Sequence, residues 1–300
     1  MDADCIIIGA GPSGLHTGTY LGRFLCKAIV LNGARPRASW IPVTHNFPGF
    51  PEGVTGFELL ELLRLQSLEY GSIMRDERAV EVTGEDGAFA VKTNKSTITA
   101  KKIVFATGVY DIPPDVPNAP HYKGATIRHC PVCDAYESRG RRLAVFGWDA
   151  HAVKITLWLS KYSKDISLLT TGHASRADIH SWDLEVMDRI GIPLYQSRVA
   201  AIEEHGDELG DIVFEDGSRL KDIFRGYSAM GLHPNSEVAA AMGVNVDERG
   251  FIKVDRKQCT NMRGVYAVGD VAGPDVGQLC VGMAHAAIAA TDINNHLLEF

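Results

Sequence analysis

The sequence lacks any apolar run long enough to cross a membrane. Its longest apolar stretches, 5–8 and 103–106, have the length of strands, whereas a membrane-spanning helix needs about 18 or more apolar residues. The basic start of a secretory signal is also missing, because the chain begins Met1-Asp-Ala-Asp4. Low-complexity tracts and long internal repeats are absent too. We therefore expect a folded cytoplasmic protein without a membrane-spanning segment.

Positive charge is scarce as well. Lys and Arg total 30 residues against 37 for Asp and Glu, which gives a formal net charge of −7. Phosphate backbones repel such a chain on average, so we expect no nucleic-acid partner. An island of positive charge is nevertheless formed by Arg128, Arg139, Arg141 and Arg142. These arginines either dock an acidic redox protein or belong to an exposed, solvated loop.

Cysteine is too sparse for a disulfide-stapled secreted domain, since six are spread over 300 residues. Two of them form Cys130-Pro-Val-Cys133, just before Asp134 and an expected helix start, where a thiol pKa is lowered and two sulfurs can close a redox-active ring. Half of a zinc site is the alternative, but no second pair of this kind follows, so we expect no metal. Asp134 either passes a proton to a thiolate or is an ordinary acid at a helix start. The other cysteines are expected to be small buried residues: Cys5, Cys26, Cys259 and Cys280.

Strand and helix patterns alternate along the chain, which is typical of α/β folds. An apolar strand over 4–8 leads into a helix that ends near Leu25, and 28–31 is the next strand. This β-α-β unit has about the length that a mononucleotide-binding half requires. A helix is expected over 54–70, and the last helix over about 277–298.

A second β-α-β unit follows a cluster of four prolines within 113–120, which interrupts regular structure. Its strands are expected at 142–146 and 166–169, and its helix at 153–161. The prediction is an α/β protein of two Rossmann-like, three-layer ββα dinucleotide-binding domains, the second inserted into the first. The first domain comprises 1–111 and 229–300, and the inserted domain comprises 112–228.

A glycine-rich turn, Gly9-Ala-Gly-Pro-Ser-Gly14, stands between the first strand and the first helix. In this context the first glycine makes the turn, the second lets a pyrophosphate approach the backbone, and the third lets the helix pack on the strand. The alternative is a glycine-rich turn without a ligand. At the end of the second strand Asn32 replaces the usual acid, so its contact with an adenosine ribose would lack charge assistance. A late strand ends in Gly269-Asp270, before a helix whose first amides could face an anion or a flavin ring.

Four segments, in their order and spacing, resemble the low-molecular-weight thioredoxin reductase family: Gly9–Gly14, Ala106–Gly108, Cys130–Asp134 and Gly269–Asp270. The stretch His45–Pro51 also resembles this family, so the resemblance covers essentially the whole chain. It implies a homodimeric flavoprotein that binds FAD in the domain formed by the two chain ends. The redox disulfide would lie in the central domain, and the partner would be thioredoxin or a similar protein disulfide.

The resemblance also implies roles for individual residues. Cys133 would face the flavin and form the charge-transfer thiolate, Cys130 would exchange with the substrate disulfide, and Asp134 would be the acid/base. The pyrophosphate would lie on the glycine turn, the ribityl-phosphate side of FAD near Asp270, and the isoalloxazine edge near Gln278. The implied cofactor-binding residues are Gly9, Gly11, Pro12, Ser13, Gly14, Asn32, Asn46, Thr107, Gly108, Gly269, Asp270 and Gln278.

The central domain departs from the family at its nucleotide loop, which reads Gly147-Trp-Asp-Ala-His-Ala152. Asp149 stands where the family has glycine, so it brings a negative charge to the pyrophosphate position. At about 4 Å and an effective dielectric near 20, that contact costs on the order of 4 kcal/mol, about a thousandfold in affinity. The segment 170–176, which follows the strand at 166–169, has one arginine, Arg176, where the family has several for a 2′-phosphate. We therefore predict that neither NADPH nor NADH is used efficiently.

Three kinds of pyridine-nucleotide-independent relatives fit this pattern: reductases fed by ferredoxin, proteins with an additional flavin in the vacated nucleotide site, and dithiol oxidases. The oxidases typically carry histidine after the second cysteine, whereas this chain has Asp134, which favours the reductase side. The leading hypothesis is therefore an FAD-dependent disulfide reductase with another donor. A dithiol oxidase that uses oxygen and a flavin-containing redox sensor are the alternatives.

Two aromatic residues keep open roles. Trp148 either packs on a flavin or fills the core, and the core is favoured. Phe300 either caps a flavin or frays at the chain end.

Overall fold

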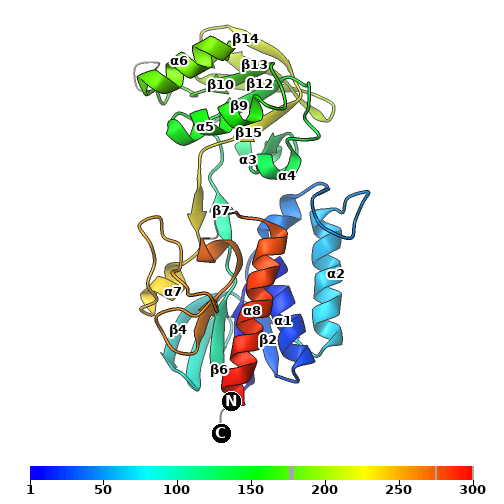
Figure 1. The fold of residues 1–300 in the computed structure, drawn as a ribbon, viewed down its shortest axis with the longest axis vertical. Helices are drawn as coiled ribbons and strands as arrows, with labels where there is room; N and C mark the ends of the chain where they lie inside the picture. Colours follow the sequence, from blue (N-terminus) through cyan, green and yellow to red (C-terminus); the bar gives the residue numbers. More distant parts are fainter. Residues whose placement is uncertain (176–178, 274–275, 299–300) are drawn as a thin grey trace. The chain divides into compact units, whose positions relative to one another are not determined.

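The computed structural model describes residues 1–175, 179–273 and 276–298. They form two compact units: unit 1 comprises 1–43, 47–110 and 233–300, and unit 2 comprises 44–46 and 111–232. Two paired strands, β7 (Val109–Asp111) and β16 (Leu232–Pro234), lie at the connections between the units (Figure 1). No helix among the described residues is both long and apolar enough to cross a membrane.

Unit 1 is built on one mixed sheet of seven strands: β1 (Ala3–Ile8), β2 (Ala28–Leu31), β3 (Ile73–Arg75), β4 (Ala79–Glu85), β5 (Ala88–Thr93), β6 (Thr97–Phe105) and β17 (Val265–Ala267). The order is β3-β2-β1-β6-β5-β4, and β17 pairs with β6. The pairs among β3, β2, β1, β6 and β17 are parallel, while β4, β5 and β6 form an antiparallel meander. The first β-α-β unit expected from the sequence is therefore present.

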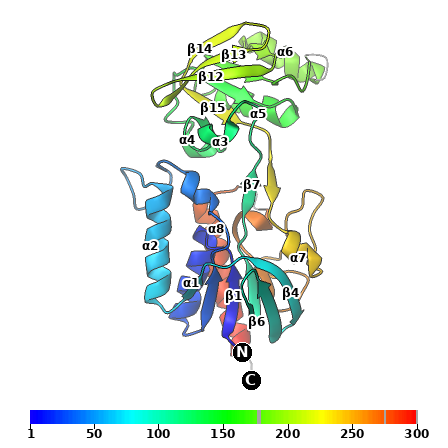
Figure 2. The ribbon, with the colours of Figure 1, turned by 180° about the vertical axis from the view of Figure 1, so that it is seen from behind.

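The two faces of this sheet have different covers. Alternate residues of β1 point to opposite faces, so that Ile7 joins one buried cluster while Ile6 and Ile8 join the other. Three helices cover the Ile7 face, as Figures 1 and 2 show: α1 (Pro12–Arg23), α2 (Gly56–Glu69) and α8 (Leu279–Leu297). Residues of the meander and of α7 (Glu237–Ala241) fill the other cluster. Two short 3-10 turns complete unit 1: η1 (Arg37–Trp40) and η3 (Gly269–Ala272).

Unit 2 repeats this layering around a parallel sheet ordered β11-β10-β9-β15-β8. Its strands are β8 (Ile127–Arg128), β9 (Leu143–Phe146), β10 (Ile166–Leu169), β11 (Leu194–Tyr195) and β15 (Arg225–Ser228). A separate antiparallel sheet is made of β12 (Val199–His205), β13 (Glu208–Phe214) and β14 (Arg219–Ile223). The helices are α3 (Ala119–Tyr122), α4 (Pro131–Asp134), α5 (Ala150–Leu159) and α6 (Ser181–Ile190).

Alternation along β9 again separates two buried clusters. Leu143 and Val145 pack with residues of α5 and α6, whereas Ala144 and Phe146 pack with the antiparallel sheet. The predicted fold class, two Rossmann-like ββα domains, is therefore confirmed. Helix α5 begins at Ala150, earlier than the predicted residue 153, because the Asp149 carboxylate accepts a hydrogen bond from the Ala152 amide at 2.9 Å and caps the helix.

The expectation that the scattered cysteines are buried holds for Cys5 alone. Cys26 and Cys259 are half-buried, and Cys280 is exposed. Cys280 lies in the first turn of α8 and is exposed, so the general tendency of free cysteines to be buried did not apply to it.

Candidate active site

The glycine turn of unit 1 adopts a shape that leaves room for a ligand at one position only. Gly9 has φ +118°, and a Cβ there or at Gly14 would overlap backbone of Ala106 or Gly9 itself. A Cβ at Gly11, by contrast, would meet no atom within 4 Å. Gly9 and Gly14 are thus required by packing, whereas Gly11 opens the turn to an approaching group, as the pyrophosphate role predicts. The turn therefore fits a dinucleotide.

Segments far apart in the sequence meet at this turn. A Cβ at Gly269 would lie 2.5 Å from Ser13 Oγ, and one at Gly282 would also collide with that hydroxyl. The start of α1, η3 and α8 therefore pack closely together. Sequence reasoning missed Gly282, whose small size permits this contact.

Asp270, in η3, has a basic partner that the sequence did not reveal. The Arg37 Nη1 atom lies 3.3 Å from Asp270 Oδ2, and both side chains are about one-quarter to one-third exposed. A Cβ at Gly277 would lie 3.5 Å from Asp270 Oδ1, so the chain just before α8 passes close to this carboxylate. Gln278 immediately precedes α8, and its side-chain amide donates to the carbonyl of Gly277 at 3.0 Å.

The other predicted cofactor residues of unit 1 are also tied to partners. The Asn32 side-chain amide donates to Asp76 Oδ1 at 2.9 Å. Asp76 directly follows β3, which pairs with β2, so a carboxylate lies beside Asn32 although the end of β2 itself carries none. The Thr107 hydroxyl donates to the carbonyl of Asn235 at 2.6 Å, and the Asn235 side chain donates back to the carbonyl of Thr107 at 2.9 Å. Gly108 has φ +65° and open space at its Cβ position.

Asn46 belongs to a different unit from the other predicted cofactor residues. It belongs to the segment 44–46, which groups with unit 2, and it accepts a hydrogen bond from the Thr44 hydroxyl at 2.8 Å. Its role in cofactor binding stays a prediction.

The Cys130-Pro-Val-Cys133 segment forms the disulfide expected from the resemblance, with a Cα separation of 5.3 Å. Cys130 occupies the position just before the short helix α4, and the Cys133 amide donates to the carbonyl of Cys130 at 3.0 Å. Both cysteines are half-buried, whereas Val132 and Tyr136 beside them are exposed. The disulfide therefore lies at the surface of unit 2, flanked by apolar groups.

Asp134, at the end of α4, lies in a polar network assembled from three elements. Arg128 Nε is 3.4 Å from Asp134 Oδ2, and the buried Tyr227 hydroxyl donates to Asp134 Oδ1 at 3.1 Å. Strands β8 and β15 pair in a register that places Arg128 opposite Tyr227, which explains how both reach one carboxylate. The Tyr227 and Ser138 hydroxyls are 2.9 Å apart.

Burial dominates the electrostatics of this network. It raises the pKa of Asp134 from 3.8 to about 6, while the Arg128 charge and the Tyr227 hydrogen bond partly oppose the rise. Burial also raises the pKa of Tyr227, and the Asp134 charge adds to the rise. A carboxyl that titrates near neutrality next to a disulfide can exchange a proton with a thiolate, as predicted for Asp134. Sequence reasoning missed Tyr227 altogether.

The arginine island is largely neutralised within unit 2. Arg128 pairs with Asp134, Arg142 with Asp165 at 2.8 Å, and Arg141 with Glu208. Arg139 instead lies over the Tyr136 ring, 3.5 Å from its centroid. Most of the charge expected to dock an acidic protein is therefore already satisfied inside the protein.

The nucleotide loop of unit 2, residues 147–152, has no exposed glycine. A Cβ at Gly147 would meet Ala152 Cβ at 2.5 Å, so this glycine is required by packing. The exposed Asp149 places its carboxylate on the first turn of α5. Trp148 is half-buried and lies on the His173 ring, with centroids 4.2 Å apart, so the expected core position was wrong. Arg176 and Phe300 lie outside the described residues.

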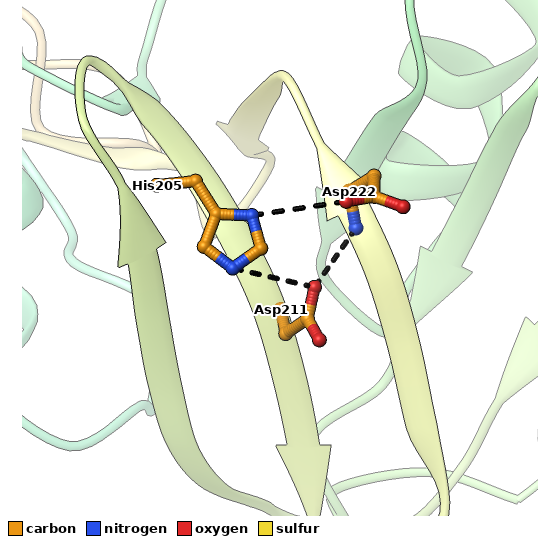
Figure 3. A group of neighbouring side chains, drawn as sticks. All are labelled: His205, Asp211 and Asp222. Carbon is orange, nitrogen blue, oxygen red and sulfur yellow. Dashed lines mark hydrogen bonds and ion pairs between the residues drawn. The ribbon is translucent and has the colours of Figure 1, made fainter.

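A histidine and two carboxylates also meet on the antiparallel sheet (Figure 3). His205 lies between Asp211 and Asp222, 3.8 and 3.7 Å from their nearest oxygens. Its two ring nitrogens face different carboxylates, the Asp222 amide already donates to Asp211 at 3.0 Å, and Arg219 lies 3.7 Å from Asp211. The group is therefore better described as an ion-pair network than as a cation site.

The family described as pyridine nucleotide-disulphide oxidoreductase matches residues 3–291. The thioredoxin reductase of Mycolicibacterium smegmatis is 27% identical over 99% of this chain and 97% of its own length. The atypical thioredoxin reductase TRi from Desulfovibrio vulgaris Hildenborough is 31% identical, with a TM-score of 0.54 over 99% of this chain and all of that one. The structure of HlmI is 25% identical, with a TM-score of 0.90 over 99% and 93% of the two chains.

One similar protein is named for its electron donor. The NADPH-dependent thioredoxin reductase 3 of Arabidopsis thaliana is 27% identical over 98% of this chain and 59% of its own length. This name disagrees with the prediction that the present chain does not use NADPH. The only support for that prediction is the sequence and structure of the loop 147–152 and of the segment after β10 in unit 2.

Proposed function

The chain belongs to the pyridine nucleotide-disulphide oxidoreductase family, and from that premise we propose that it is an FAD-dependent dithiol/disulfide oxidoreductase similar to thioredoxin reductase. The observation that carries this proposal is the surface disulfide Cys130–Cys133 beside Asp134, whose pKa is raised to about 6. A carboxyl that titrates in this range can protonate the thiolate that leaves during thiol–disulfide exchange.

FAD would be held in unit 1. The open backbone at Gly11 would take the pyrophosphate, together with Pro12 and Ser13, while Asn32 and Asp76 lie where an adenosine ribose is expected. Asp270, Thr107, Gly108, Gly269 and Gln278 complete the proposed set. When bound, FAD would supply the two-electron couple that the disulfide needs.

The chain's own groups would perform the exchange with the protein substrate, for which thioredoxin is the proposed partner. In the reduced protein the Cys130 thiolate attacks one sulfur of the substrate disulfide, and a mixed disulfide forms as the other sulfur leaves. Cys133 then attacks Cys130, which restores the Cys130–Cys133 disulfide and releases the substrate as a dithiol. Asp134 supplies a proton to the departing thiolate.

We further propose that the electron donor is not a pyridine nucleotide. The carboxylate of Asp149 already occupies the first turn of α5, where the diphosphate of NADPH would bind. Because Asp149 is exposed, the repulsion at about 4 Å lies between roughly 1 kcal/mol in bulk water and 4 kcal/mol at an effective dielectric of 20. A ferredoxin-like donor and a cytoplasmic homodimer remain part of the proposal, although most of the arginine island is neutralised.

Anaerobic stopped-flow mixing of the oxidised holoprotein with NADPH tests the donor. We expect little flavin bleaching at micromolar nucleotide, while dithionite bleaches the flavin fully and leads to reduction of the disulfide. Fast, stoichiometric bleaching by NADPH would refute the donor proposal without affecting the disulfide chemistry.

One variant and its control separate the reductase from its alternatives. Cys130→Ser is expected to abolish thioredoxin reduction by the dithionite-reduced protein, whereas a redox sensor would retain partner binding. Oxygen consumption with small dithiols, lost in the same variant, would instead identify a dithiol oxidase. Cys280→Ser serves as the control, because that exposed cysteine lies outside the disulfide.

A further inference from the structure

Side chains from several loops of unit 2 meet beside the carboxyl ends of its parallel strands. Strands β9 and β10 pair so that Phe146 lies opposite Leu169, and the loops that follow them leave the sheet side by side. Trp148 comes from the first loop and His173 from the second, which is why their rings meet, tilted by 33° with centroids 4.2 Å apart.

His173 is fixed in this position from its other side. Its Nε2 atom lies 2.8 Å from Asp115 Oδ2, and Arg198 Nη1 lies 3.5 Å from the same oxygen. A Cβ at Gly172 would be 2.5 Å from Arg198 Cγ, so the arginine stem lies across the loop after β10. We call these four residues the cover: Asp115, Trp148, His173 and Arg198.

The position of the cover has a chemical consequence. In open α/β sheets a dinucleotide binds outside the carboxyl ends of the strands, with its diphosphate at the first helix and its adenosine beside the next strand. In unit 2 the first place holds the Asp149 carboxylate, and the second holds the His173 ring. An incoming adenine would have to displace a ring that contacts Trp148 and is paired with the Asp115 carboxylate.

We propose that the cover determines specificity by closing the nucleotide site of unit 2 to dinucleotides, flavin and pyridine alike. The inference deepens the donor proposal and rests on it. It also predicts one flavin per chain, because the partly exposed side chains of the cover lie where a second flavin would bind. Arg198, whose stem lies across the loop after β10, is paired with Asp115.

Binding of 2′-phospho-ADP-ribose, the part of NADPH that carries no hydride, tests the cover without any redox step. Isothermal titration calorimetry on the FAD-loaded protein would compare wild type with His173→Ala, Asp149→Asn and the double variant. His173→Phe is the matched control, since it keeps a ring on Trp148 but loses the bond to Asp115.

We expect no measurable binding by wild type or His173→Phe at micromolar ligand. His173→Ala should bind at least tenfold more tightly than wild type, and the double variant more tightly than either single variant. Binding by wild type equal to that of His173→Ala would overturn the cover, as would a double variant no better than Asp149→Asn. Thermal melts that match wild type show that each variant is folded.

These outcomes are distinct from failure of the donor proposal. Wild type that binds the ligand while NADPH leaves the flavin oxidised would refute the cover alone. Wild type that is reduced by NADPH would refute the donor proposal and with it the cover. A flavin count above one per chain in the purified protein would also contradict the cover.

Discussion

Asp134 is expected to titrate near pH 6, and removing one hydroxyl should move that value further. Tyr227→Phe deletes the group that donates to Asp134 Oδ1 at 3.1 Å. A hydrogen bond to a charged group contributes about 1.5–3 kcal/mol, and we take the lower end because the same hydroxyl also bonds Ser138. Since one pKa unit corresponds to about 1.4 kcal/mol, the pKa of Asp134 should rise by about one unit.

Carbon-13 NMR of protein labelled at aspartate carboxyls measures this directly. Asp134→Asn identifies the resonance, because the signal that titrates near pH 6 should disappear in that variant. The Tyr227→Phe protein should then show its midpoint near pH 7, and the pH profile of disulfide exchange should shift in the same direction. A midpoint near 4 in wild type, or one that Tyr227→Phe leaves unchanged, would refute the account of this network.

The same shift predicts a pH dependence of stability. The pKa of Asp134 is raised in the folded state, so the folded protein binds more protons than the unfolded chain between about pH 3.8 and 6. The stability contributed by this group is therefore greatest below pH 3.8 and falls as pH rises through 6, by up to about 3 kcal/mol. Relative to wild type, the free energy of unfolding of Asp134→Asn should therefore rise by that amount between pH 3.5 and 7, as measured by urea unfolding. A difference between the two proteins that does not change with pH would contradict the raised pKa of Asp134.

Three further predictions concern other residues. Gly14→Ala should prevent folding of unit 1, whereas Gly11→Ala should fold but bind FAD at least tenfold more weakly. Thermal melting measures folding, and flavin absorbance per chain measures FAD binding. Equal behaviour of the two variants would contradict the difference between their Cβ environments. Replacing Asp149 by Ala should cost about 1 kcal/mol of stability in urea unfolding, and by Asn almost nothing, because asparagine caps helices as well as aspartate does. Iodoacetamide at pH 8 should label exposed Cys280 long before Cys259, since burial raises the pKa of the Cys259 thiol to about 12; mass spectrometry that finds Cys259 modified first would refute this order.

The sequence was sufficient to predict local structure where a short motif is compatible with only one backbone arrangement. The spacing of Gly9, Gly11 and Gly14 between a strand and a helix predicted a turn in which two glycines are needed for packing and one leaves space, and the structure has that arrangement. The Cys130-Pro-Val-Cys133 pair likewise predicted a disulfide at a helix start, because three residues of separation suit a short ring. Trp148 and Cys280 were misplaced, since their burial depends on which face of an element meets a neighbour.

What the sequence determined by itself is the alternation of strands and helices, the glycine turn and the cysteine pair, because these depend on contacts between residues a few positions apart. Only the tertiary structure decided what surrounds them. Tyr227 reaches Asp134 across 93 positions because β15 lies next to β8, and His173 reaches Trp148 because β10 lies next to β9. Strand order is set by the packing of whole layers, and no local spacing encodes it.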